Sequence, residues 1–200
     1  IFFLLIHFST RGFIMSNRFK RMCEQSLISE MLVRDFLDLK FPFQFHITPH
    51  NEQLAFSSSG IHVADIQCVE KPNVAFEVKE DIMSSKTGNL AFEILGLHRL
   101  RLWGLGAGIQ HIYLLYINHI DFCLDVFELG MYEAKLELEL ENLQMKNAKC
   151  RLVNGGDQYE PMYIVPLEIA RSLNCCRSSE FFTDVDMFLF SKSAKIRLQR

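Results

Sequence analysis

Three short runs with strand character follow one another in the first half of this sequence, and they limit its fold more than any other feature. The runs cover residues 61–69, 73–79 and 90–95. The segment 71–73 between the first two runs reads Lys-Pro-Asn, which suits a hairpin turn. The chain is therefore expected to contain a β-hairpin followed by a third strand.

Side chains alternate between two faces along a strand, and this alternation sorts the second run. Phe76 and Val78 are expected on one face, whereas Glu77 and Lys79 are expected on the other. If the first two runs pair through the turn, Asp65 lies beside Glu77, with Lys79 next in line. Two carboxylates and one amine are therefore predicted to share one face of the hairpin.

Other segments alternate between helix and strand character. The segment from Asn17 to about Leu39 lacks Gly and Pro, which predicts a helix. Residues 131–146 fit a helix by propensity, although Leu and Glu alternate across 136–141 with the period of a strand. Further strands are expected at 43–48, 111–118, 121–129 and 148–153, and short helices in the ambiguous segment 97–108 and at 166–173. This order predicts an α/β or α+β fold, with an N-terminal helix and a mixed central sheet flanked by helices.

The length of 200 residues is enough for one domain with its own core. We expect this domain over 17–175, with 1–16 as an extension and 176–200 as a tail to which no element is assigned. Residues 1–14 are read either as upstream sequence or as an extra edge strand. The apolar run Ile1–Phe8 is too short to span a bilayer, so no membrane partner is expected.

Charge and cysteine content limit the partners and the compartment. The net charge of −3 gives no global basic field of the kind that nucleic-acid-binding domains carry, so contact with a polyanion must come from a local patch. The six cysteines show no zinc-binding spacing. They are read as reduced thiols of a cytoplasmic protein.

Asp65, Glu77 and Lys79 form the pattern that carries chemistry. Two adjacent carboxylates repel each other, and a divalent cation between them relieves this repulsion. Mg²⁺ prefers carboxylate oxygens, water and substrate phosphate as ligands, and a nearby lysine adds a compact positive charge. The set therefore predicts a phosphodiester hydrolase site. The competing interpretation is a solvated face or a cross-strand ion pair, because Glu-x-Lys occurs by chance in many strands.

The residues after this pattern extend it. Asp81 follows the Glu-x-Lys element, a short polar loop leads to Thr87-Gly88-Asn89, and Glu93 lies in the third strand-like run. This arrangement resembles the PD-(D/E)XK nuclease superfamily, in particular its phage-encoded, Holliday-junction-resolvase-like members. The likeness covers about residues 60–170 and is densest at 65–94.

The resemblance implies a restriction-endonuclease-like core and a metal-dependent deoxyribonuclease activity. The metal implied is Mg²⁺, with Mn²⁺ as a substitute. Its ligands would be Asp65, Glu77 and the carbonyl of Val78, and Lys79 would position or activate the attacking water. Lys79, Asp65 and Glu77 are therefore the catalytic residues that the family pattern implies.

The same resemblance implies further site residues. The family often adds a glutamate of the first helix to the metal shell, which implies Glu24, with Glu30 as the alternative. Glu93 is either an accessory residue of the metal site or a partner of an arginine at 99 or 101. The loop residues expected to contact the DNA backbone, or else to tie the loop together, are Ser85, Lys86, Thr87 and Asn89.

The function implied is DNA cleavage in phage DNA processing or recombination, in the cytoplasm of the host. The partner implied is DNA, and a homodimer is compatible with the resemblance because many relatives cut two strands as pairs. The alternative is a catalytically inactive nucleic-acid-binding or structural module with the same fold.

Overall fold

The computed structural model describes residues 17–49, 63–121, 123–154 and 161–181, and it describes only the backbone of 17–25 and 178–181. The expected extension 1–16 therefore lies outside the described residues. The helices are α1 (Asn17–Lys40), α3 (Ser84–Thr87), α4 (Ile94–Gly106), α5 (Lys135–Lys146) and α6 (Leu167–Arg171). The strands are β1 (Phe45–Ile47), β2 (Ile66–Cys68), β3 (Val74–Asp81), β4 (Asn89–Glu93), β5 (His111–Asn118), β6 (Cys123–Glu128), β7 (Arg151–Val153), β8 (Met162–Pro166) and β9 (Cys176–Phe181).

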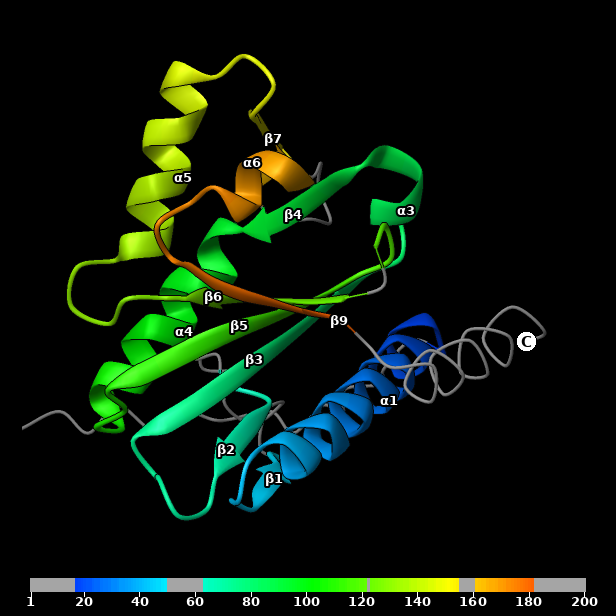
Figure 1. Cartoon of the computed structure of the whole chain (residues 1–200), viewed down its shortest axis with the longest axis vertical. Coiled ribbons are helices and arrows are strands. Elements are labelled where there is room, and N and C mark those ends of the chain that lie inside the picture. The colour runs from blue at the N-terminus through cyan, green and yellow to red at the C-terminus, as the bar shows by residue number, and fades with distance from the viewer. Residues whose placement is uncertain (1–16, 50–62, 122, 155–160, 182–200) are drawn as a thin grey trace, which may run out of the picture.

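The central sheet has six strands in the order β1-β2-β3-β5-β6-β9 (Figure 1). β3 and β5 are parallel, whereas the other neighbouring pairs are antiparallel. Parallel neighbours need a crossover connection, which α3, β4 and α4 form between β3 and β5. The predicted α+β class, with a mixed central sheet flanked by helices, is therefore confirmed.

Each face of the central sheet is covered by a different layer. A smaller sheet, ordered β4-β8-β7, packs with α4, α5 and α6 on one face. In the core on this side the ring of Phe92 lies 5.7 Å from that of Tyr116 and 5.4 Å from that of Phe127, measured between centroids. Helix α1 covers the other face, where Val33 and Leu37 pack in the second core (Figure 1).

The cysteines and the helices bear on two expectations from the sequence. The described cysteines are all free thiols, namely Cys68, Cys123, Cys150, Cys175 and Cys176. In the described ranges, no helix combines the length and the apolar character that crossing a bilayer requires.

The last strand, β9, was not predicted from the sequence. It reads Cys-Arg-Ser-Ser-Glu-Phe, which offers little apolar signal. Its antiparallel pairing with β6 forms the edge of the central sheet. Edge strands are held by backbone hydrogen bonds on one side and commonly carry polar side chains, so apolar periodicity is a poor guide to them. The segment 176–200 therefore begins with a strand of the central sheet.

The Leu/Glu-rich segment forms a helix, as propensity predicted. Leu136 and Leu140 are buried, and Leu143 packs against the same core. These spacings of four and three residues place the three leucines on one face of α5. The alternating pattern in this segment arises because Leu138, half exposed, occupies the opposite face.

Gly130→Ala is expected to lower the free energy of unfolding by about 1–3 kcal/mol, measured by urea denaturation. Gly130 has a φ of 70°, and a Cβ there would lie 2.7 Å from the Cβ of Lys135 and 2.9 Å from its backbone nitrogen. Gly106→Ala is the control, because no described atom lies within 4 Å of the added carbon. It is expected to leave stability unchanged or to raise it by up to about 1 kcal/mol. Equal losses in the two variants would contradict this account.

Candidate active site

Strand β3 separates two environments through the alternation of its side chains. Glu77 and Lys79 line a small cavity beside β4 and α4. Val78, between them, is buried in the core under α1, and Phe76 packs against the same core. The two faces that the sequence predicted for this strand are therefore present.

Asp65 lies directly before β2, at the position opposite Glu77. The antiparallel register pairs Ile66 with Phe76, and one step further along the ladder are Asp65 and Glu77. Asp65 is only 7% exposed, and its Oδ2 accepts a hydrogen bond of 2.8 Å from the backbone N–H of Val78. The carboxylate therefore reaches the backbone of β3 next to Glu77.

A third carboxylate, that of Glu30, acts on Asp65 from α1. Glu30 is fully buried, and its Oε1 accepts a hydrogen bond of 2.7 Å from the hydroxyl of Ser26. Burial raises the pKa of Asp65 well above its ordinary value, and the negative charges of Glu77 and Glu30 raise it further. The hydrogen bond from Val78 opposes this rise. The carboxylates at 30 and 77 therefore both act on Asp65, and we call these three residues the carboxylate cluster.

Glu30 lies on the buried face of α1. Glu30 and Leu37 are seven residues apart, or about two turns, and both are buried. The side chain of Glu24 itself lies outside the described part of the chain. The alternative acid, Glu30, is thus the described helix carboxylate that approaches Asp65.

The amine of Lys79 forms an ion pair with Glu93. The Nζ of Lys79 lies 2.5 Å from the Oε1 of Glu93, and the two side chains are 31% and 45% exposed. Together with Glu77 they line the cavity, which measures about 40 Å³ and has room for two or three water molecules. Of the two arginines considered for Glu93, Arg101 pairs with Glu137 instead, at 3.1 Å.

The polar loop after β3 is held by its own hydrogen bonds. The hydroxyls of Ser85 and Thr87 donate to backbone carbonyls of the preceding turn at 3.0 and 3.1 Å, and the side-chain amide of Asn89 donates to the carbonyl of Thr87 at 2.9 Å. Gly88 ends α3 with a φ of 69°, the left-handed conformation expected for it. Lys86 is exposed. These contacts fit the loop-tying role, and DNA contact by these residues stays a prediction.

Tyr116 links β4 to β3 through hydrogen bonds. Its buried hydroxyl donates to the Oδ2 of Asp81 at 3.2 Å and accepts the backbone N–H of Ala91 at 2.9 Å. Burial raises the pKa of Tyr116 well above its ordinary value, and the charge of Asp81 adds to the rise. The phenol therefore remains protonated and links β5 to both β3 and β4.

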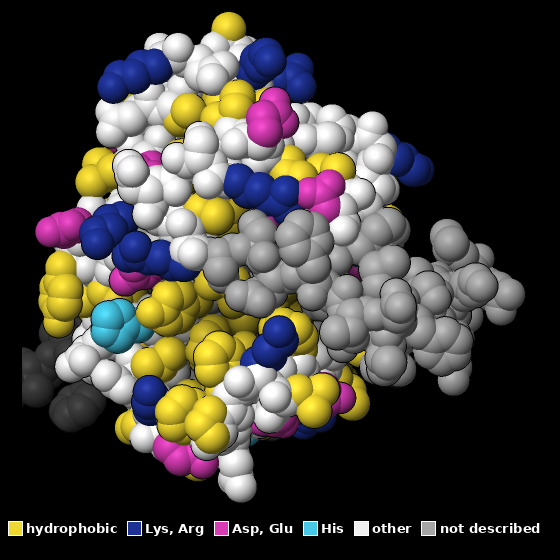
Figure 2. Space-filling view, in the orientation of Figure 1, with side chains coloured by type: hydrophobic (Ala, Val, Ile, Leu, Met, Phe, Trp, Pro, Cys, Tyr) yellow, Lys and Arg dark blue, Asp and Glu magenta, His cyan; other side chains and the backbone are white. Residues whose placement is uncertain are grey.

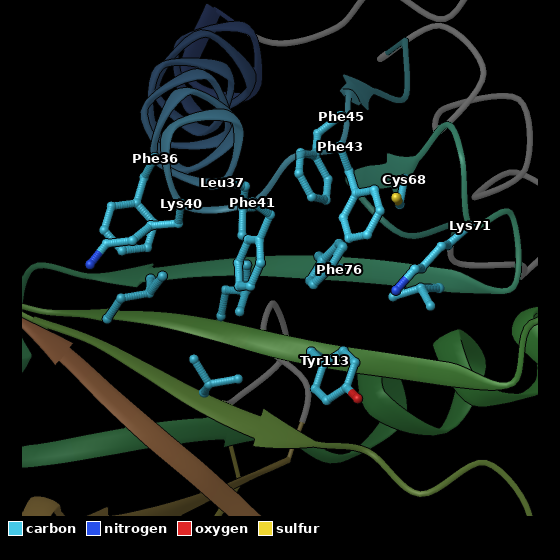
Figure 3. A pocket seen from close by; sticks show the side chains of 14 residues that line it. Phe36, Leu37, Lys40, Phe41, Phe43, Phe45, Cys68, Lys71, Phe76 and Tyr113 are labelled. Carbon is cyan, nitrogen blue, oxygen red and sulfur yellow. The ribbon is translucent and has the colours of Figure 1, made fainter.

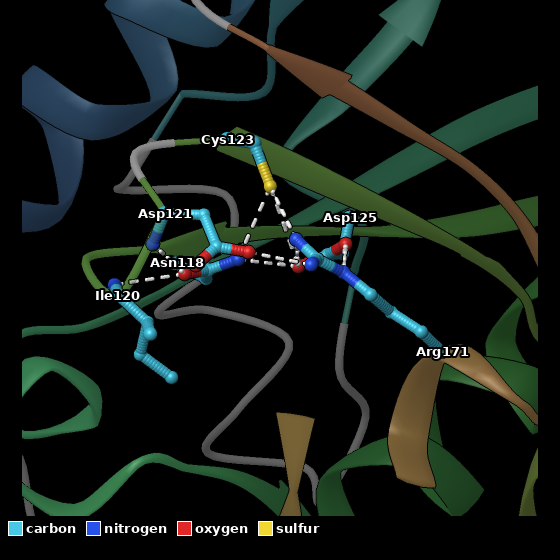
Figure 4. A network of polar contacts seen from close by, with 6 residues as sticks. All are labelled: Asn118, Ile120, Asp121, Cys123, Asp125 and Arg171. Atoms are coloured by element: carbon cyan, nitrogen blue, oxygen red, sulfur yellow. Dashed lines mark hydrogen bonds and ion pairs between the residues drawn. The ribbon is translucent and has the colours of Figure 1, made fainter. Parts of the chain in front are cut away.

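Sequence reasoning missed a buried polar cluster at the turn between β5 and β6 (Figure 4). The Oδ1 of Asp125 accepts the Nε–H of Arg171 at 2.7 Å, and its Oδ2 accepts the side-chain amide of Asn118 at 2.6 Å. Arg171 also contacts Asp121 at 2.5 Å and the thiol of Cys123 at 2.7 Å. Burial, followed by the charge of Asp125, raises the pKa of Cys123 to about 12.

A signal for this cluster was present in the sequence. Asp125 interrupts the apolar run 121–129, and a carboxylate that is buried in a strand requires a charged or hydrogen-bonding partner. The partner, Arg171, comes from the predicted helix at 166–173, and no local pattern connects the two. Because its polar groups bond to one another, the cluster serves to hold α6 against β6.

The candidate metal ligands belong to the carboxylate cluster. Among the described residues, no three or more His, Cys, Asp or Glu side chains are grouped so that they could hold a metal ion. Mg²⁺ needs fewer protein ligands, because it usually binds one or two carboxylates and completes its shell with water and substrate phosphate. Asp65 and Glu77, with Glu30 nearby, are therefore the residues that could bind Mg²⁺ or Mn²⁺. A carbonyl ligand from Val78 stays a prediction.

No protein-family model, curated protein or solved structure matches this chain. Membership of the PD-(D/E)XK superfamily therefore stays a prediction that rests on the residues named above.

Asp65→Asn is expected to raise the free energy of unfolding at neutral pH when divalent cations are absent. Folding raises the pKa of Asp65, so its protonated form is favoured in the folded state. Protonated Asp65 therefore stabilises the folded state at pH values below its pKa in the unfolded chain. This stabilisation is lost as pH rises through its higher pKa in the folded protein. Asn removes the charge and keeps an acceptor for Val78.

Urea unfolding in EDTA between about pH 4 and about pH 8 measures this difference. The parent protein should lose more stability over this range than the Asp65→Asn variant does. The control, Glu133→Gln, changes an exposed carboxylate and should keep the parent's pH dependence. Parallel curves for the parent and Asp65→Asn would contradict the raised pKa.

Proposed function

We propose that this chain is a metal-dependent DNA endonuclease that hydrolyses phosphodiester bonds at the carboxylate cluster, in the manner of the PD-(D/E)XK nucleases. The observation that carries the proposal is that Asp65, bonded to the backbone N–H of Val78, lies opposite Glu77 in the register of β2 and β3. Lys79 lies two residues further along the same strand and lines the same cavity as Glu77. The carboxylates that could bind a metal and the amine that could contact a phosphate therefore lie on the same side of β3.

A divalent cation would compensate the negative charge of the carboxylate cluster. Asp65 and Glu30 are buried, and like charges in a buried place are unfavourable unless a proton or a cation compensates them. Carboxylate oxygens are the ligands that Mg²⁺ prefers. When bound, Mg²⁺ supplies positive charge that stabilises the phosphate in the transition state.

Lys79 provides the positive charge that the protein itself contributes. Its ammonium is partly exposed and is held by Glu93. A phosphate oxygen entering the cavity competes with Glu93 for the three N–H donors of Lys79. Lys79 can then donate a hydrogen bond to the phosphate or orient the attacking water, and Glu93 acts as a positioning residue for the amine.

The size of the cavity favours a polymeric substrate. A volume of about 40 Å³ cannot enclose a small organic molecule, which needs roughly 300 Å³ or more. A phosphate that belongs to a long chain can instead approach from the surface while the rest of the polymer stays outside. By the family resemblance this polymer is DNA, and the role is phage DNA processing or recombination in the host cytoplasm. A homodimer is compatible with this role.

A nucleic-acid-binding or structural module without turnover is the second candidate. The ion pair between Lys79 and Glu93 favours it, because a neutralised amine is a weaker electrostatic catalyst. The net charge of −3 also gives little general attraction for DNA. The two candidates differ in whether DNA is cut.

The protein is expected to cut plasmid or branched DNA in the presence of Mg²⁺ or Mn²⁺. Gel electrophoresis of the DNA after incubation measures the cleavage. Glu77→Gln and Lys79→Ala should each lower the cleavage rate by roughly 100-fold or more, because they remove a metal ligand and the catalytic cation. Glu141→Gln and Lys149→Ala are matched controls at exposed positions and should cut at the parent's rate.

Failure of the parent protein to cut any DNA with either metal, together with retention of DNA in a gel-shift assay, would reject the enzyme in favour of the binding module. Cutting by Lys79→Ala at the parent's rate would remove Lys79 from the mechanism. Cleavage of a small phosphoester but not of DNA would reject the polymeric substrate.

The choice between Glu30 and Glu24 can be made without an activity assay. Titration with Mn²⁺, followed by electron paramagnetic resonance of the free ion, reports metal affinity directly. Glu30→Gln should weaken Mn²⁺ binding by about tenfold or more, because it removes a carboxylate that acts on Asp65. Glu24→Gln should leave the affinity unchanged, and the reverse order would return Glu24 to the metal site.

A further inference from the structure

An apolar pocket lies between the C-terminal end of α1 and the central sheet (Figure 3). Its volume is about 500 Å³, within the range of roughly 300–1,000 Å³ that is typical of sites for small organic ligands. Phe76 lines it, whereas Glu77 faces the other side of β3. The pocket is therefore separate from the carboxylate cluster.

Aromatic rings form a continuous wall in this pocket. The ring of Phe45 lies 6.4 Å from that of Phe41 and 5.7 Å from that of Phe76, and the ring of Phe76 lies 5.8 Å from that of Tyr113. Contacts of this kind fix the rings before any ligand arrives. Phe41 is nevertheless 48% exposed, so the wall presents apolar surface to a molecule that enters. Figure 2 shows hydrophobic side chains gathered in the region of β3 and α1 on this face.

The charges at the pocket all have one sign. Among the described residues that line it, only Lys40 and Lys71 are charged, and none is acidic. The Nζ of Lys40 lies 5.4 Å from the ring centroid of Phe36, and the Nζ of Lys71 lies 4.3 Å from that of Phe43. The two lysines lie at opposite ends of the apolar wall (Figure 3). A ring contact leaves the charge of an ammonium in place, so the end of the wall at Lys71 attracts an anion.

We infer that this pocket binds an amphipathic carboxylate, with its hydrocarbon body against the phenyl rings and its carboxylate at Lys40 or Lys71. A neutral apolar molecule would use the wall and neither lysine. A second copy of the chain docked by two-fold symmetry would set this positive patch against itself, which is unfavourable. The combination of an apolar wall with cationic ends therefore favours a small amphipathic anion.

Octanoate and octan-1-ol are the matched probes, because they share a hydrocarbon chain and differ in charge. Calorimetric titration of the full chain should show saturable binding of octanoate and weaker binding of octan-1-ol. Lys40→Glu and Lys71→Glu are surface substitutions, and at least one should weaken octanoate binding about threefold or more, with a larger loss in the double variant. Lys149→Glu changes the net charge equally at an exposed site outside the pocket and should have no effect.

Three results would overturn the proposal. The first is no saturable octanoate binding by the parent, the second is equal affinity for octanoate and octan-1-ol, and the third is unchanged octanoate binding in the double lysine variant. In the first case, a parent protein that sediments as a dimer, and as a monomer after Phe41→Glu, would assign the pocket to a second copy of the chain. None of these measurements depends on DNA cleavage, so the proposed nuclease activity is tested separately.

Discussion

The hydrogen bond from the backbone N–H of Val78 to Asp65 is the contact on which the candidate site depends. It draws a carboxylate from the start of β2 onto β3, beside Glu77 and within the influence of Glu30. Burial and two like charges oppose an ionised Asp65, and the single N–H only partly offsets them. Such an arrangement is unfavourable unless a proton or a cation compensates the negative charge, and the proposal of a metal site rests on this constraint.

Much of the fold was accessible from local patterns. The hairpin of β2 and β3, the strand β5 and the helices α1 and α5 follow from propensity, turn chemistry and periodicity, because each of these signals lies within a few neighbouring residues. The edge strand β9 carries polar residues and is specified by backbone pairing with β6, which leaves little trace in a sequence. The assembly of β4, β7 and β8 into a separate sheet likewise depends on contacts between distant segments.

The candidate site was only partly predictable for the same reason. Alternation along β3 was enough to set Glu77 and Lys79 on one face, and the hairpin register set Asp65 opposite Glu77. The approach of Glu30 to Asp65 could be recognised only from the structure, which shows which face of α1 is buried. The diffuse apolar pattern of that helix did not reveal this face. The pairing of Lys79 with Glu93 joins two strands of different sheets, and no spacing rule foretells it.

Strand β3 contributes to both cavities, because Glu77 lines the small cavity and Phe76 belongs to the aromatic wall of the apolar pocket. Successive residues of a strand are joined by one rigid peptide plane, so a rotation of the backbone that turns the phenyl ring also turns the neighbouring carboxylate. Hydrogen bonding of β3 to both β2 and β5 resists such a rotation. A substitution that shifts the backbone at either residue is therefore expected to disturb both sides of the strand.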